Sequence, residues 1–115
     1  MSSSTIRALA AFDKFKGAFT ALEACAAAVE GMEGGTCCPI ADGGEGTVEA
    51  LAGVLGGEWR EVAVSDPLGR RVVARYLVAT GADGKLTAVM EMSEASGFER
   101  CLDGVKDPWV ASTRG

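Results

Sequence analysis

The feature that most constrains the fold is a change in the spacing of hydrophobic residues near Gly57. Before it, short apolar runs alternate with stretches of helical spacing. After it, Val62 and Val64 alternate with polar or small neighbours, as in a strand with one buried face. Strand-helix units form one kind of sheet, and successive strands with alternating hydrophobic residues form another. We therefore expect the chain to leave one sheet near Gly57 and to enter a second substructure.

The first half of the chain begins with a predicted strand and helix. Residues 5–11 (TIRALAA) form a short apolar run that is typical of a buried strand opening into a loop. Thr20 and Glu23 then have the spacing of a capping box. A helix is expected over residues 21–32, closed by the glycine pair that follows.

A second strand-loop-helix unit follows. Residues 36–40 (TCCPI) fit a strand, and Pro39 places it near a sheet edge or at the end of its pairing. A glycine-rich loop comes next, and residues 47–55 have helical spacing with a glycine pair as the stop. The first half therefore predicts two successive strand-loop-helix units.

The second half predicts an antiparallel meander of three strands. Residues 66–69 (DPLG) and 81–85 (GADGK) are turn signals, and residues 86–92 (LTAVMEM) fit the last strand. Alternate residues of the middle strand are expected to share one face: Val72, Ala74, Tyr76 and Val78.

Charge and composition exclude several classes of function. The net charge is -5, and the 11 lysine and arginine residues are scattered, so the basic stripe that nucleic-acid binding needs is missing. No apolar run approaches the ~20 residues that cross a bilayer, and the start, MSSST, lacks the features of a secretory signal. We expect no nucleic-acid or membrane partner and a cytoplasmic location. Because the chain has no histidine, acid-base chemistry must fall to carboxylates or lysines.

The loop ADGGEGT, residues 41–47, lies between a predicted strand and a predicted helix. Its glycines let the backbone approach a ligand, N–H groups at a helix start attract anions, and Asp42 or Glu45 could hold a divalent cation. These features favour recognition of a phosphate or carboxylate. An equally good interpretation has Asp42 cap the helix and Glu45 complete a second capping box, with the glycines serving only a tight turn.

A second polar segment, FDKFKG at residues 12–17, follows the first predicted strand. Ligands gather at the carboxyl ends of strands in α/β sheets. Asp13 could bind a metal or accept a proton, and Lys14 or Lys16 could neutralise a phosphate. For either lysine taken alone, a solvated surface position is the more frequent alternative.

A third polar segment, EMSEASG at residues 91–97, ends the last predicted strand. Its carboxylates and hydroxyls could orient a small hydroxy acid. Ser93 with Glu94 could equally cap a helix, which is a purely structural role.

Five segments together resemble the bacterial-type glycerate kinase family, specifically the glycerate 2-kinase class. They occur in the family's order and fill most of the chain from Thr5 to Gly115. The combination of ADGGEGT, DPLGR and EASG at these separations is not expected by chance. The five segments are FDKFKGAFTALEA, PIADGGEGTVEAL, VSDPLGRRVVARY, AVMEMSEASGFE and KDPWVASTRG.

The resemblance implies two α/β domains with the active site in the cleft between them. On this basis residues 1–57 belong to a flavodoxin-like domain, and residues 58–115 start a second, mixed α/β domain. The resemblance also implies an enzyme that transfers a phosphoryl group from ATP to D-glycerate with Mg²⁺ as cofactor, and it favours 2-phosphoglycerate as the product. The sequence leaves the oligomeric state open.

The resemblance also assigns roles by position. Asp13 and Lys16 match the acidic and basic positions after the family's first strand, and residues 42–47 match its glycine-rich acidic loop. We expect Asp42 to be a metal ligand or the base for the glycerate hydroxyl, Asp13 a second metal ligand, and Lys16 a charge clamp. The residues expected to bind substrate or phosphate are Gly43, Gly44, Glu45, Gly46, Thr47, Glu91, Ser96 and Gly97.

The chain departs from the family pattern at two positions and in length. Phe12 stands where the family usually has proline, and Ala18 where it has serine. Because the family continues well past residue 115, the chain is expected to be a truncated fragment that is inactive alone, with exposed strand edges. A rival from another functional class is a non-catalytic module in which the same loops bind phosphate or nucleotide without reaction.

Overall fold

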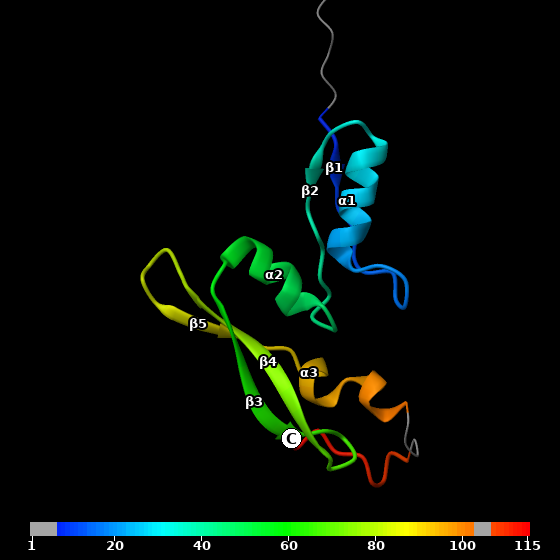
Figure 1. Ribbon diagram of the computed structural model, residues 1–115, viewed down its shortest axis with the longest axis vertical. Helices are drawn as coiled ribbons and strands as arrows, with labels where there is room; N and C mark the ends of the chain where they lie inside the picture. Colours follow the sequence, from blue (N-terminus) through cyan, green and yellow to red (C-terminus); the bar gives the residue numbers. More distant parts are fainter. Residues whose placement is uncertain (1–6, 103–106) are drawn as a thin grey trace, which may run out of the picture. The chain divides into compact units, whose positions relative to one another are not determined.

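The computed structural model describes residues 7–102 and 107–115 (Figure 1). Contacts within the chain divide it into two compact units, Met1–Asp42 and Gly43–Gly115. One unit holds a parallel pair of strands and the other an antiparallel sheet, so the expected mixed α/β class is confirmed. Thr5 and Ile6 of the expected first strand, and Lys106 of the last family segment, lie outside the described residues.

The first unit is a strand-helix-strand arrangement. β1 (Leu9–Ala10) and β2 (Thr36–Cys37) pair in parallel, and α1 (Ala21–Gly31) connects them and packs on both. Figure 1 shows α1 lying alongside the two strands. Cys25 on α1 is fully buried, and Ala10 on β1 is 2% exposed, so the small side chains of this unit let the helix approach the strands closely.

The parallel pairing continues beyond the two short strands. The N–H of Cys38 donates to the Ala10 carbonyl at 2.8 Å, and the N–H of Ile40 donates to the Phe12 carbonyl at 2.9 Å. Pro39 lies between these two donors, where its missing N–H removes no bond of the ladder. This alternation explains how a proline is accommodated in the expected strand, and it carries the chain to Asp42.

The capping box predicted at the start of α1 is confirmed. The Thr20 hydroxyl oxygen accepts from the Glu23 N–H at 3.2 Å, and the Glu23 carboxylate accepts from the Thr20 N–H at 2.8 Å. The backbone hydrogen bond from Thr20, followed by the bond from its side chain, lowers the pKa of Glu23 below its ordinary value. Both bonds join residues that are near in sequence, which is why the pattern could be predicted.

The end of α1 differs in one detail from the prediction of a glycine stop. The N–H of Glu33 donates to the Glu30 carbonyl and the N–H of Gly34 to the Val29 carbonyl, each at 3.2 Å, which is the bond pattern of a Schellman motif. The left-handed position of this motif is taken by Glu33, with φ 54, and not by a glycine. The glycine pair follows one residue later.

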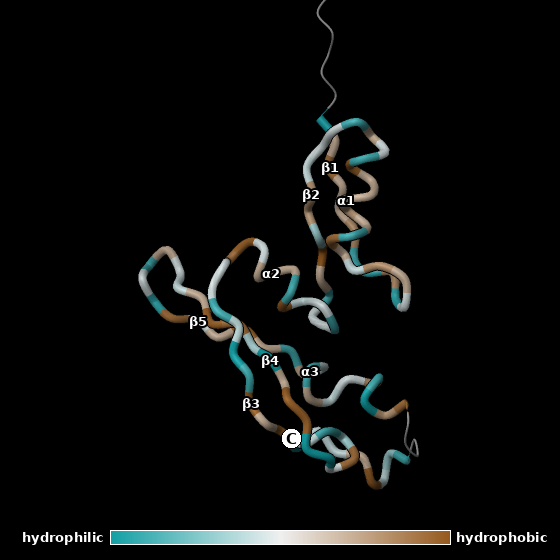
Figure 2. Tube along the Cα trace, in the orientation of Figure 1, coloured by the Kyte–Doolittle hydropathy of each residue, from teal (hydrophilic) through white to brown (hydrophobic). Residues whose placement is uncertain are grey.

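The second unit contains the expected three-stranded meander. β3 (Glu58–Ser65), β4 (Arg71–Thr80) and β5 (Leu86–Val89) are antiparallel in the order β3-β4-β5. Figure 2 shows β3 changing from hydrophilic near its start to hydrophobic near its end. β5 stops at Val89, earlier than the expected residue 92, because the chain then turns into α3 (Ser93–Ser96) and the 3-10 helix η1 (Phe98–Cys101).

Helix α2 (Thr47–Leu55) packs against β4 and so belongs to the meander. Val48 on the helix is 2% exposed, and Leu77 and Ala79 on β4 are 1% and 4% exposed. The latter two lie on the opposite face of β4 from the alternating set expected from the sequence. Because α2 shares this core, the contacts divide the chain after Asp42, whereas the sequence analysis places the boundary at Gly57.

The turn between β3 and β4 is built around the buried carboxylate of Asp66, which is 3% exposed. It accepts from the N–H of Leu68 at 2.9 Å, from the N–H of Arg70 at 2.8 Å, and from the Arg70 guanidinium at 2.6 Å. Burial opposes the charge, but the bonds from Arg70 and Leu68 and the charge of Arg70 together lower the pKa of Asp66 below its ordinary value. The predicted turn therefore has a charged centre.

Candidate functional site

The glycine-rich loop enters α2 through two glycines in left-handed conformations. Gly43 has φ 90, and Gly46, the N-cap of α2, has φ 87. The N-cap makes no side-chain hydrogen bond, so the interpretation in which Asp42 and Glu45 form a capping box is wrong for α2. A local side-chain cap cannot form here, because the N-cap residue is a glycine and has no side chain.

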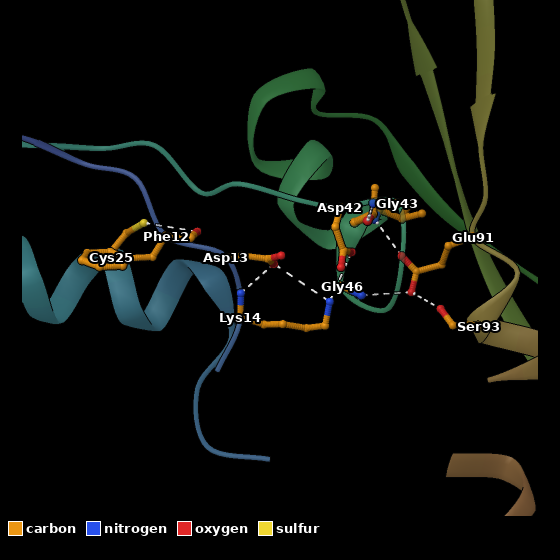
Figure 3. A network of polar contacts seen from close by, with 11 residues as sticks. Phe12, Asp13, Lys14, Cys25, Asp42, Gly43, Gly46, Glu91 and Ser93 are labelled. Carbon is orange, nitrogen blue, oxygen red and sulfur yellow. Dashed lines mark hydrogen bonds and ion pairs between the residues drawn. The ribbon is translucent and has the colours of Figure 1, made fainter. Parts of the chain in front are cut away.

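The start of α2 is capped instead by Glu91, which comes from the segment after β5 (Figure 3). One carboxylate oxygen of Glu91 accepts from the N–H of Gly46 at 3.1 Å, and the other accepts from the N–H of Val48 at 3.0 Å. Ser93 donates its hydroxyl to the first of these oxygens at 2.8 Å. Two of the three polar segments found in the sequence, residues 42–47 and 91–97, are therefore joined directly.

Other amide groups of the loop also have acceptors within the protein. The N–H of Gly43 donates to the Thr47 hydroxyl at 3.1 Å, and the N–H of Thr47 donates to the Gly44 carbonyl at 3.2 Å. Together with Gly46 and Val48, four amides that could have cradled a phosphate make bonds inside the chain. These bonds, two of them to Glu91, hold the loop in its observed conformation.

The rest of segment 91–97 is fixed on the edge of β4. The Glu94 carboxylate accepts from the backbone N–H of Arg75 at 3.0 Å and from its guanidinium at 3.2 Å, so it continues the ladder where β5 has ended. Arg75 also lies over the Trp59 ring, 4.8 Å from the centroid. A Cβ on Gly97 would lie 2.5 Å from the Ser93 carbonyl oxygen, so Gly97 serves close packing. Ser96 is half-buried at the end of α3.

The third polar segment belongs to the first unit, where it lies near Asp42. The Lys14 ammonium is 3.3 Å from an Asp42 carboxylate oxygen and 3.9 Å from an Asp13 carboxylate oxygen (Figure 3). The two expected acidic residues of this unit therefore converge on one cation. Lys16, the expected charge clamp, is exposed on the same loop. The sequence offered two lysines two positions apart, and only the folded loop shows which one approaches both carboxylates.

Asp13 and Asp42 are chemically suited to Mg²⁺, which proteins often bind through one or two carboxylates while substrate phosphates and water complete its shell. Within residues 7–102 and 107–115 no group of three or more histidine, cysteine, aspartate or glutamate side chains is placed to hold a metal. The carboxylate pair thus fits a metal that arrives with a phosphate better than one enclosed by protein alone.

No helix in the described part of the chain is long and apolar enough to cross a membrane.

The model of the glycerate kinase family matches residues 8–115. The chain belongs to the glycerate kinase family. The family match covers both units and the three polar segments, so the resemblance inferred from five segments is confirmed. The site residues within them remain predictions.

Individual relatives agree with the glycerate kinase family assignment. Glycerate 2-kinase of Escherichia coli (strain K12) is 46% identical over 77 residues, which cover 67% of this chain and 19% of that protein. Glycerate kinase of Bacillus subtilis (strain 168) is 38% identical over 109 residues, covering 90% of this chain and 28% of that protein. An uncharacterised protein of Synechocystis is 40% identical over 111 residues, covering 93% of this chain and 29% of that protein.

A solved structure resembles the fold as well. The crystal structure of a protein assigned as glycerate kinase 2 from Salmonella typhimurium LT2 matches with a TM-score of 0.66 and 36% identity, and the match covers 91% of this chain and 29% of that chain. The present chain therefore spans less than a third of the length of these glycerate kinase relatives.

Proposed function

We propose that the protein to which this chain belongs phosphorylates D-glycerate with ATP. The observation that carries the proposal is the glycerate kinase family match over residues 8–115. The positions of Asp13 and Asp42 support it, because two carboxylates that converge on one cation are suited to phosphoryl transfer. Such enzymes act mainly by positioning and by electrostatic stabilisation, so no histidine is required.

In this proposal each polar group of the first unit has a defined task. Asp13 and Asp42 would hold Mg²⁺, which would neutralise the charge that develops on the phosphates. Asp42 is also the candidate base for the glycerate hydroxyl. Lys14 and Lys16 supply positive charge to the transferred phosphoryl group, and Lys14 balances the two carboxylates before the metal is bound.

Three finer points belong to the same proposal. The favoured product is 2-phosphoglycerate, residues 1–57 are part of a flavodoxin-like domain, and turnover requires the regions that the relatives have in addition. Since the chain spans less than a third of those proteins, we expect the isolated chain to show no turnover. Phosphorus NMR of the product distinguishes the 2-phosphate from the 3-phosphate.

A chimera tests the proposal without that restriction. The matching segment of Bacillus subtilis glycerate kinase, 109 residues at 38% identity, is replaced by this chain. The proposal predicts ATP-dependent phosphorylation of D-glycerate by the folded chimera. A folded chimera without turnover, beside an active parent enzyme, would reject it.

The alternative is a module that binds phosphate or nucleotide without catalysis. Calorimetry of the isolated chain with MgATP and with D-glycerate measures binding alone. Binding of MgATP to the chain, together with an inactive chimera, would favour this alternative over the kinase.

A further inference from the structure

We propose that Glu91 is a positioning residue. Its carboxylate caps the N-terminus of helix α2 and holds the glycine-rich loop in its observed conformation. Glu91 then acts through the loop and not by touching the substrate. The inference rests on contacts within the unit Gly43–Gly115 and adds a role to the proposed function.

Glu91 has the geometry of a helix cap at the start of α2. The first N–H groups of a helix have no partner within the helix, and the helix dipole favours a negative charge beside them. Glu91 meets both needs, because its two oxygens accept from two different amides, Gly46 at 3.1 Å and Val48 at 3.0 Å. Hydrogen bonds to a charged acceptor are about twice as strong as neutral ones.

The N-cap of α2 has no side chain that could cap the helix. This residue is Gly46, which takes a left-handed conformation with φ 87. A serine or aspartate there would be a local cap, but a left-handed backbone is costly for a residue with a side chain. The loop therefore keeps its glycine and takes its cap from a residue 45 positions away.

Glu91 is itself held in place by neighbouring contacts. The Ser93 hydroxyl donates to Glu91 at 2.8 Å, and the Glu94 carboxylate binds Arg75 on β4 through two bonds. The segment that carries Glu91 is thus fixed to the sheet. The conformation of the loop is consequently coupled to the edge of β4.

The occupied amides also determine how the loop meets a free anion. A phosphate that approached the N–H groups of Gly46 and Val48 would have to displace the Glu91 carboxylate. We therefore expect these two amides to be insensitive to phosphate in the wild-type chain. Removal of the Glu91 charge should make them accessible to it.

Nitrogen-15 NMR of the full chain tests the proposal directly. In Glu91→Gln, which keeps the shape but offers one acceptor oxygen, the Gly46 and Val48 amide resonances should shift, and their hydrogen exchange should accelerate about tenfold or more. Glu91→Asp retains the carboxylate and should restore part of the protection. Glu49→Gln is the matched control, since it removes the same charge from the first turn of α2, where Glu49 is exposed.

The outcomes separate positioning from general stability. Equal effects of Glu91→Gln and Glu49→Gln on the two amides would overturn the proposal, as would a phosphate titration that shifts them in the wild type as strongly as in Glu91→Gln. If Glu91→Gln does not fold, Ser93→Ala and the wild-type phosphate titration provide the test. None of these readouts needs turnover, so a failure of the kinase proposal would remain distinguishable from a failure of this one.

Discussion

At the scale of single residues, Asp66 shows how a charge can be buried at a turn. It is the one charged or polar side chain among residues 7–102 and 107–115 that is fully buried, and three hydrogen bonds compensate its desolvation. Because the folded state favours the charged form, the pKa of Asp66 lies below its ordinary value. Such a carboxyl stabilises the fold at pH values above its unfolded pKa, and this contribution is lost as the pH falls through the folded pKa.

Replacing Asp66 by Asn tests this directly. The variant should unfold at a lower urea concentration than the wild type at neutral pH. Below about pH 4 the difference should shrink, because only the wild type loses the contribution of the Asp66 charge. Urea midpoints measured from pH 7 to pH 2.5 give the comparison.

Asp83→Asn is the control for the Asp66 series. Asp83 accepts from the Lys85 N–H at 3.1 Å in the next turn but is exposed, so its removal should leave the acid dependence close to that of the wild type. An Asp66→Asn variant with the wild-type pH dependence would contradict the buried-charge explanation.

The polar segments could be found from the sequence, but the partners of their side chains could not, and the roles of these residues in a site stay predictions. Asp13 and Asp42 lie near the Lys14 ammonium, whereas Lys16 was the expected charge clamp. Glu91 was expected at the substrate, whereas the structure gives it two bonds to α2. Contacts between residues more than 40 positions apart leave no local pattern to detect.

At the scale of elements, glycines determine where helices and strands can start and stop. Gly57, with φ 107, precedes β3 where the chain passes close to β4, and a Cβ there would lie 2.5 Å from the Val78 carbonyl oxygen. Gly53, in the middle of α2, has open space around the corresponding position. The two glycines occur four residues apart but have opposite structural demands.

Alanine at these two positions should therefore have opposite effects. Gly57→Ala should destabilise the chain by about 1–3 kcal/mol, through the strained backbone and the close contact. Gly53→Ala should stabilise it by about 0.5–1 kcal/mol, because alanine is the better helix former. Denaturant unfolding measures both, and a tolerated Gly57→Ala would contradict the close approach of β3 and β4.

The end of α1 gives a second prediction at this scale. Glu33 takes the left-handed position of the Schellman motif, which glycine adopts without strain. Glu33→Gly should stabilise the chain by about 0.5 kcal/mol, the relieved strain being partly offset by the entropy that glycine adds to the unfolded chain. Met32→Gly is the control, since Met32 has φ -91 and no such strain, and a gain there of equal size would contradict the argument.

Elements were predictable where their signals are local. The capping box of α1, the three strands of the meander and its two turns all follow from residues adjacent in sequence. The cap of α2 depends on a tertiary contact, in which Glu91 accepts from the N–H groups of Gly46 and Val48. The left-handed Glu33 was missed because two glycines directly after it offered the better conformational match.

At the scale of the whole molecule, the division of the chain falls inside the glycine-rich acidic segment. The boundary between the two compact units lies between Asp42 and Gly43, and not at Gly57 where the hydrophobic period changes. The change of period marks the start of the meander, but α2 packs against β4 and so belongs with it. The hydrophobic spacing alone could not show that α2 packs against β4, because it indicates which face of a helix is apolar and not what that face contacts.

We propose that this chain supplies Asp42 to a phosphoryl-transfer reaction on glycerate, and turnover of the Bacillus subtilis chimera tests this role most directly. We expect Asp42→Asn to lower kcat by about 100-fold or more, the usual scale for loss of a general base, while Asp83→Asn in the exposed turn keeps the chimera's activity. Full turnover by a correctly folded Asp42→Asn chimera would contradict the account.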